Sequence, residues 1–179
     1  MYSFRFNLPT FLTFSRIILI PFFIVITPKS PLIGITIFLI ASATDFLDGY
    51  LARRSGQITK FGIILDPIAD KFLVISALIL LVDMVRLSAW IATVMIIREF
   101  VVTGLRVVAL SRNNIIMPAE KGGKLKTTFQ MISIILLLLP GGFGDIDFYD
   151  IGLIFMYIAL TLAVVSGIKY TISFWRQSQ

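Results

Sequence analysis

The chain has 179 residues, of which 58% are hydrophobic and 15% charged, and its mean hydropathy of +0.95 predicts a single integral membrane domain over residues 1–179. The sequence contains no cysteine or histidine, which excludes disulfides, thiolate nucleophiles, imidazole bases and zinc sites with sulfur or imidazole ligands. In so apolar a chain, the net charge of +6 favours anionic lipid head groups or phosphorylated substrates as partners over nucleic acid.

Six apolar runs approach or reach the length of about 17–25 residues that a helix needs to cross a bilayer. In chain order they are Phe11–Thr27, Leu32–Arg53, Gly62–Asp83, Ala89–Leu110, Leu125–Pro140 and Tyr149–Phe174. The breaks between them are rich in residues that favour turns. The sequence therefore predicts an all-α integral membrane protein with six transmembrane helices.

Basic residues gather at alternate ends of these runs. One face would carry Arg5, Arg53, Arg54, Lys60, Arg112, Lys121, Lys124, Lys126 and Arg176, and the other only Lys29 and Arg86. Because positive loops stay on the cytoplasmic side, the first face is expected to be cytoplasmic, with both termini there. We therefore expect a multi-pass protein of the cell membrane.

Two pairs of aspartates interrupt the second and third runs. Asp45 and Asp48 are three residues apart, and Asp66 and Asp70 are four apart, so each pair shares one face of its helix. At about 1.5 Å per residue, both pairs lie about 6–12 Å inside the cytoplasmic ends of two neighbouring antiparallel helices. The four carboxylates are therefore predicted to meet at matching depths.

Four converging carboxylates in a partly dry site need compensating positive charge. A purely oxygen donor set selects hard cations, so Mg²⁺ or Mn²⁺ is expected, and the number of carboxylates suits two ions. A structural interpretation competes for single residues: each aspartate could pair with Arg53, Arg54 or Lys71, and Asp66 before Pro67 could be a helix N-cap.

Two glycines and an arginine accompany the acids. Gly49 follows Asp48, and Gly62 precedes Asp66 by four residues, so a bulky ligand could approach the backbone at either point. Close helix packing explains each glycine equally well. Arg53 could hold a phosphate beside the acids, or could simply mark the cytoplasmic boundary.

The pattern Asp45-x2-Asp48-Gly49-x2-Ala52-Arg53-x8-Gly62-x3-Asp66-x3-Asp70 resembles in full the signature of the CDP-alcohol phosphatidyltransferases. The six predicted spans and the length extend the resemblance to the whole chain. Within the family, "NLPTFLTFSR", "REF" and "GGKLKTTFQ" look most like the members that join CDP-diacylglycerol to glycerol 3-phosphate.

This resemblance implies a role for each matching residue. The four aspartates would bind two divalent ions that hold the CDP-diacylglycerol pyrophosphate, and Asp70 would also deprotonate the acceptor hydroxyl. Asn7, Thr10, Gly49, Ala52, Arg53, Thr59 and Gly62 would bind CDP-diacylglycerol. Members of the family are usually homodimers, so a homodimer is expected.

Four cations suggest how the acceptor is recognised. Arg98 and Arg106 lie in the fourth run, and Lys124 and Lys126 begin the fifth. Cations inside a membrane normally line a polar cavity or find a partner, so together they favour an acceptor that carries phosphate. Taken singly, Arg98 could pair with Glu99, and the two lysines could be boundary anchors.

Other functions remain open on the sequence alone. A related synthase could use inositol phosphate, or a second phosphatidylglycerol to make cardiolipin. Level aspartates in membrane helices could also form the ion site of a divalent-cation transporter, although transport favours acids near the midplane with access to both faces. A non-catalytic membrane scaffold leaves the register of the aspartates unexplained.

Overall fold

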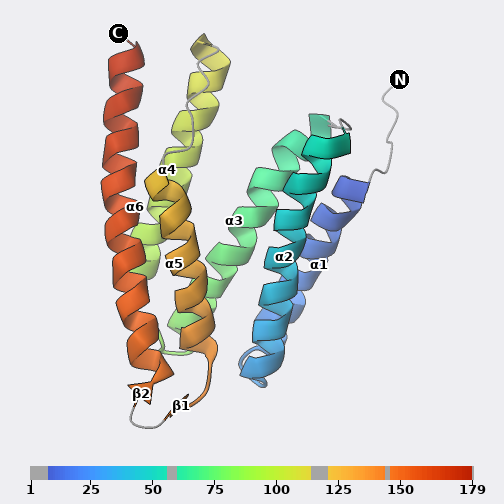
Figure 1. Ribbon diagram of the computed structural model, residues 1–179, viewed down its shortest axis with the longest axis vertical. Coiled ribbons are helices and arrows are strands. Elements are labelled where there is room, and N and C mark those ends of the chain that lie inside the picture. Colours follow the sequence, from blue (N-terminus) through green and yellow to red (C-terminus); the bar gives the residue numbers. More distant parts are fainter. Residues whose placement is uncertain (1–7, 56–59, 114–120, 144–145, 179) are drawn as a thin grey trace. The chain divides into compact units, whose positions relative to one another are not determined.

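The computed structural model describes residues 8–55, 60–113, 121–143 and 146–178 (Figure 1). Six helices are present in this part of the chain, and they follow the six predicted runs closely. They are α1 (Leu8–Ile26), α2 (Pro31–Ser55), α3 (Lys60–Asp83), α4 (Ala89–Asn113), α5 (Lys121–Leu138) and α6 (Phe148–Ser178). The all-α prediction is confirmed. A short hairpin of two-residue strands, β1 (Gly142–Phe143) and β2 (Ile146–Asp147), was not predicted.

The chain divides into two compact units, Met1–Leu80 and Leu81–Gln179. In the first unit, α1 and α2 pack as a hairpin around Phe23 and Phe38, which are fully buried with ring centroids 5.8 Å apart. Gly34 permits this close approach, because a Cβ there would lie 2.2 Å from Oγ1 of Thr27. The turn between the helices is closed by the N–H of Ser30, which donates to the carbonyl of Ile26 at 2.8 Å.

The second unit contains α4, α5 and α6, and α6 packs against both of the others. The helix α5 runs antiparallel to α6, whereas α4 runs parallel to it (Figure 1). Large apolar side chains fill the core, including Met95 of α4, Ile134 and Leu137 of α5, and Met156 of α6, all fully buried. Apolar packing therefore sets the positions of these three helices.

The β-hairpin joins α5 to α6 and supplies the N-cap residue of α6. Gly142 pairs with Asp147 across the two strands. A side-chain oxygen of Asp147 then accepts the N–H of Tyr149 at 2.9 Å, which caps the first turn of α6. Asp150 follows in the same turn, where its negative charge interacts favourably with the helix dipole.

The turn between α3 and α4 has an unusual backbone. Val85 takes a left-handed conformation, with a φ of 58°. The N–H of Arg86 donates to the carbonyl of Leu81 at 2.8 Å, and that of Val85 to Val82 at 3.0 Å. These two bonds form the Schellman cap that usually has glycine at the left-handed position. The valine therefore holds strained backbone at the end of α3.

Among the described residues, one helix is long and apolar enough by itself to cross a membrane. It is Phe148–Arg176 of α6, in which an 18-residue window has a mean hydropathy of 2.4. Shorter apolar stretches occur at Ile17–Ile26, Pro31–Thr44 and Leu125–Leu138. In α2 and α4, charged residues follow the apolar part of the same helix and shorten its apolar run.

Candidate functional site

The aspartates of the sequence pattern lie inside two consecutive helices, as predicted. Asp45 and Asp48 belong to α2, and Asp66 and Asp70 belong to α3. A spacing of three or four residues places both members of a pair on one helical face. Their side chains lie outside the described part of the structure. Their convergence on one metal site therefore stays a prediction.

One competing interpretation of these acids is wrong. Asp66 with Pro67 could have marked the start of the third helix, but α3 begins at Lys60 and continues without a break through both residues. A capping role therefore does not explain Asp66. A proline inside a helix also removes a backbone hydrogen bond. This part of α3 therefore combines aspartates and a proline in the interior of a helix, and both are unfavourable there in a purely structural helix.

Most of the other predicted ligand-binding residues lie where the structure gives no side-chain position. Asn7 and Thr59 are outside the described residues. Helical positions are described, but side chains are not, for Thr10 of α1, Gly49, Ala52 and Arg53 of α2, Gly62 of α3, Arg106 of α4 and Lys124 of α5. Gly49, Ala52, Arg53, Gly62 and Arg106 lie within the predicted spans, whereas Thr10 and Lys124 lie in helical turns that precede the predicted starts at Phe11 and Leu125.

Arg98 and Lys126, two of the predicted acceptor-binding cations, meet at one carboxylate. Oε1 of Glu99 accepts a hydrogen bond from Nη1 of Arg98 at 3.1 Å and another from Nζ of Lys126. Lys126 is buried and the other two side chains are mostly buried, with exposed fractions of 14%, 13% and 3% for Arg98, Glu99 and Lys126. The pairing of Arg98 with Glu99 that the sequence left open is therefore present, and Glu99 also joins α4 to α5 through Lys126. Binding of an acceptor phosphate by the two cations stays a prediction.

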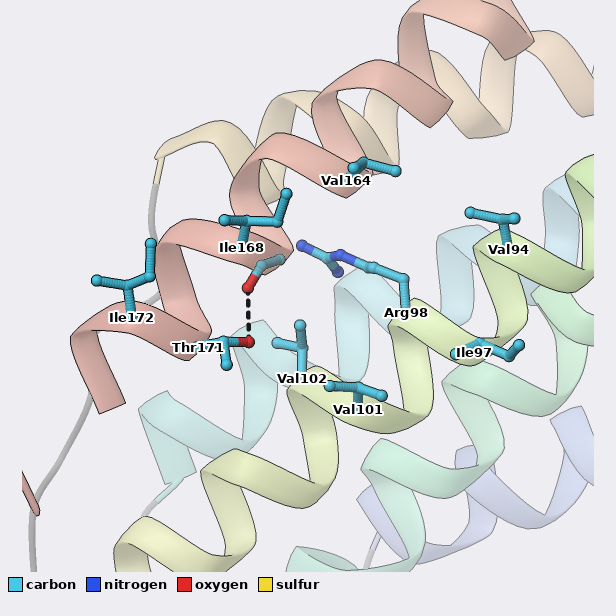
Figure 2. Close-up of a pocket in the computed structure, with 10 residues that line it drawn as sticks. Val94, Ile97, Arg98, Val101, Val102, Val164, Ile168, Thr171 and Ile172 are labelled. Atoms are coloured by element: carbon cyan, nitrogen blue, oxygen red, sulfur yellow. Dashed lines mark hydrogen bonds between the residues drawn. The ribbon is translucent and has the colours of Figure 1, made fainter. Parts of the chain in front are cut away.

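Arg98 is held from the opposite side by α6. Its Nε donates to the carbonyl of Ala163 at 3.0 Å, and its Nη2 donates to Oγ of Ser166 at 2.7 Å. Figure 2 shows the side chain reaching from α4 toward α6, level with Val164 and Ile168. Neither Ala163 nor Ser166 was predicted from the sequence, where a serine in an apolar run carries no signal of a long-range partner.

A groove of about 390 Å³ lies between α4 and α6 beside Arg98 (Figure 2). Its lining is almost entirely branched and apolar, with Val94, Val101 and Ile168 among the contributors. Thr171 turns its hydroxyl back to the carbonyl of Gly167 at 3.0 Å, so it offers the groove little polarity. Among the described residues that line the groove, Arg98 is the one that carries a charge.

The donor chemistry of the α2 and α3 pattern suits a hard divalent cation, because its four acids supply only carboxylate oxygens. Among the residues whose side chains are described, no group of three or more acids could hold a metal ion. The described cluster of Glu99 with Arg98 and Lys126 is instead cationic overall, which suits an anionic group.

Comparison with known proteins adds a family match. The model of the family described as CDP-alcohol phosphatidyltransferase matches residues 6–165. Three curated relatives share the name CDP-diacylglycerol–glycerol-3-phosphate 3-phosphatidyltransferase. The one from Bacillus subtilis (strain 168) is 41% identical, over 95% of this chain and 96% of the relative. Those from Wigglesworthia glossinidia brevipalpis and Haemophilus influenzae are 38% and 42% identical, covering 96% and 93% of this chain and 97% and 92% of their own lengths.

Proposed function

Because this chain belongs to the CDP-alcohol phosphatidyltransferase family, we propose that it transfers the phosphatidyl group of CDP-diacylglycerol to glycerol 3-phosphate, yielding phosphatidylglycerophosphate and CMP. The observation that carries the choice of acceptor is the near full-length similarity, at about 40% identity, to relatives named for that reaction. The complete aspartate pattern, placed within α2 and α3, supports the shared chemistry.

Asp45, Asp48, Asp66 and Asp70 are proposed to hold two divalent ions, Mg²⁺ or Mn²⁺. Their all-carboxylate chemistry fits such ions, and these residues have no structural role as helix caps. When bound, the ions would neutralise the charge that develops on the pyrophosphate of the donor. Asn7, Thr10, Gly49, Ala52, Arg53, Thr59 and Gly62 are proposed to bind CDP-diacylglycerol around them.

The reaction is proposed to be a direct displacement at phosphorus. An oxygen of the glycerol hydroxyl forms a bond to the lipid-linked phosphorus, and the bond from that phosphorus to the CMP oxygen breaks. Asp70 accepts the hydroxyl proton as the new bond forms. A chain without cysteine or histidine is consistent with a mechanism that has no thiolate or imidazole nucleophile. Alignment and electrostatics would then supply most of the catalysis.

Arg98, Arg106, Lys124 and Lys126 are proposed to bind the phosphate of the acceptor. The meeting of Arg98 and Lys126 at Glu99 in the second unit supports this role, because it gathers two positive charges around one negative charge. Cations inside a membrane normally line a polar cavity or find a partner. Hydrogen bonds between cations and phosphate are strong and directional. A phosphorylated acceptor is therefore favoured over serine or choline.

We place the protein in the cell membrane as a single six-span domain, with both termini and the active site facing the cytoplasm. The length and apolarity of α6 support membrane insertion. Large apolar side chains are also more than half exposed on other helices, as expected for contact with lipid. They include Ile18 and Phe22 of α1, Leu32 of α2, and Ile97 and Phe100 of α4. The family resemblance further suggests a homodimer.

The test supplies purified protein with CDP-diacylglycerol and Mg²⁺, adds glycerol 3-phosphate, inositol phosphate or serine in turn, and follows CMP release. We expect release with glycerol 3-phosphate only, and its loss in Asp70→Asn with unchanged helicity. Asp83→Asn is the matched control, because Asp83 is exposed at the far end of the same helix. Equal release with inositol phosphate would refute the acceptor, and full activity of Asp70→Asn would refute the base.

A further inference from the structure

The side of α6 that faces Arg98 is shaped to hold a guanidinium group. The Nε and Nη2 atoms, which form one edge of that group, donate to the carbonyl of Ala163 and to the hydroxyl of Ser166. The hydroxyl of Ser166 also lies 3.2 Å from the carbonyl of Ala163, to which it donates. One edge of Arg98 is therefore bound at two points by a single turn of α6.

Gly167 completes this arrangement. A Cβ at this position would lie 3.3 Å from Cγ of Arg98 and 3.7 Å from its Nε, so any larger residue would press on the side chain. We call Ala163, Ser166 and Gly167 the α6 seat. The carbonyl of Ala163 and the hydroxyl of Ser166 accept hydrogen bonds from Arg98, and the absence of a side chain at Gly167 leaves room for it.

The α6 seat acts on more than Arg98. While Nε and Nη2 are held by α6, Nη1 donates to the same oxygen of Glu99 that accepts from Lys126. These three bonds use three of the five N–H groups of the guanidinium. Arg98 therefore contributes to the position of the Glu99 carboxylate, which also accepts a hydrogen bond from Lys126 on a third helix, α5.

We propose that Ser166 and Gly167 are positioning residues for recognition of the acceptor phosphate. They fix Arg98, and through Glu99 they fix Lys126, so that both cations face the anion in one arrangement. The inference rests on the proposed function, since it assigns these cations to the phosphate of glycerol 3-phosphate. Neither residue touches the substrate. Their loss should therefore weaken acceptor binding without affecting the lipid donor.

The test measures KM for both substrates in Ser166→Ala and Gly167→Ala. Removing a hydrogen bond to a charged group, or displacing that group, should raise KM for glycerol 3-phosphate about 5- to 20-fold. KM for CDP-diacylglycerol should stay within about twofold of wild type. Protection against thermal unfolding by glycerol 3-phosphate should need a correspondingly higher concentration, which provides a readout of binding independent of turnover.

Two matched controls separate positioning from general packing. Ser133→Ala removes another buried hydroxyl, which donates at 2.6 Å to the carbonyl of Gly152 and joins α5 to α6 away from Arg98. Gly104→Ala adds a methyl group on α4, where a Cβ would meet nothing within 4 Å. Both controls should leave KM for glycerol 3-phosphate unchanged, although Ser133→Ala should lower the unfolding temperature.

The outcomes distinguish the two proposals. A wild-type protein that releases no CMP with glycerol 3-phosphate would overturn the proposed function. The positioning role alone would be overturned if the wild-type protein reacts but KM for glycerol 3-phosphate is unchanged in Ser166→Ala and Gly167→Ala. The same conclusion would follow if that KM rises only together with KM for CDP-diacylglycerol. If Gly167→Ala does not fold, Ser166→Ala decides, because it removes a single oxygen and adds no volume.

Discussion

Glu99→Gln is expected to destabilise the second unit strongly. The carboxylate of Glu99 contacts two cations through one oxygen, and none of the three side chains is more than 14% exposed. Removing one partner of a buried ion pair costs about 3–5 kcal/mol, because the remaining charge stays desolvated. For a chain of this length, that corresponds to a fall of about 6–20 °C in the midpoint of thermal unfolding.

The assay is thermal unfolding in detergent, followed by circular dichroism at one fixed heating rate. Asp150→Asn is the matched control, since it makes the same acid-to-amide change at an exposed position in the first turn of α6. Loss of its helix-dipole interaction should cost only about 0.3–1 kcal/mol. The difference between the two variants isolates the effect of the buried contacts.

A double variant tests whether the ion pair itself is responsible. Replacing a buried pair by apolar groups of similar size is often neutral or stabilising, so Lys126→Met should recover part of the stability that Glu99→Gln loses. The two effects should therefore combine with a coupling of about 1–3 kcal/mol. Simple additivity, or a Glu99→Gln midpoint equal to that of Asp150→Asn, would show that the carboxylate does not hold the two helices together.

Two further predictions concern the turn between α3 and α4. Nη1 of Arg86 donates to the carbonyls of Leu137 at 2.9 Å and Leu139 at 3.1 Å, so Arg86→Met should lower the free energy of unfolding by about 1–3 kcal/mol. Arg176→Met, at an exposed site, should lower it by less than about 0.5 kcal/mol, and equal midpoints of thermal unfolding for the two variants would contradict the prediction. Val85→Gly should raise the midpoint of thermal unfolding by about 1–4 °C, because glycine adopts the left-handed φ of 58° without strain. Val165→Gly, inside α6, should lower the midpoint, and a lower midpoint in both variants would contradict strain at Val85.

The helices were predictable because each is marked by a long apolar run between turn formers. The ends were less predictable: α5 begins at Lys121, four residues before the predicted start at Leu125. A search for apolar residues starts the fifth run at Leu125 and so leaves out Lys124 and the turn before it. Lys126 is buried in α5 beside Glu99 of another helix, which supplies a negative charge that no local pattern reveals.

The candidate site was predictable to different extents in its two parts. The aspartate pattern is local, with both pairs spaced for one helical face, and the helices contain it as predicted. The cations Arg98 and Lys126 could be selected by their cost inside a membrane, but their partners could not. Ser166 is 68 residues from Arg98, and a serine in an apolar helix most often bonds only to its own backbone.

The register between α4 and α6 explains why Arg98 finds these partners. Apolar contacts hold the two parallel helices on either side of the polar bonds: the rings of Trp90 and Tyr157 lie 6.5 Å apart at one level, and Val102 packs with Tyr170 at another. A shift by one residue would rotate the bonding groups by about 100° around the helix and unmake both apolar contacts. The packing therefore fixes the register first, and the register presents Ser166 to Arg98. It follows that a substitution that loosens this packing should disturb the acceptor cations even without touching them.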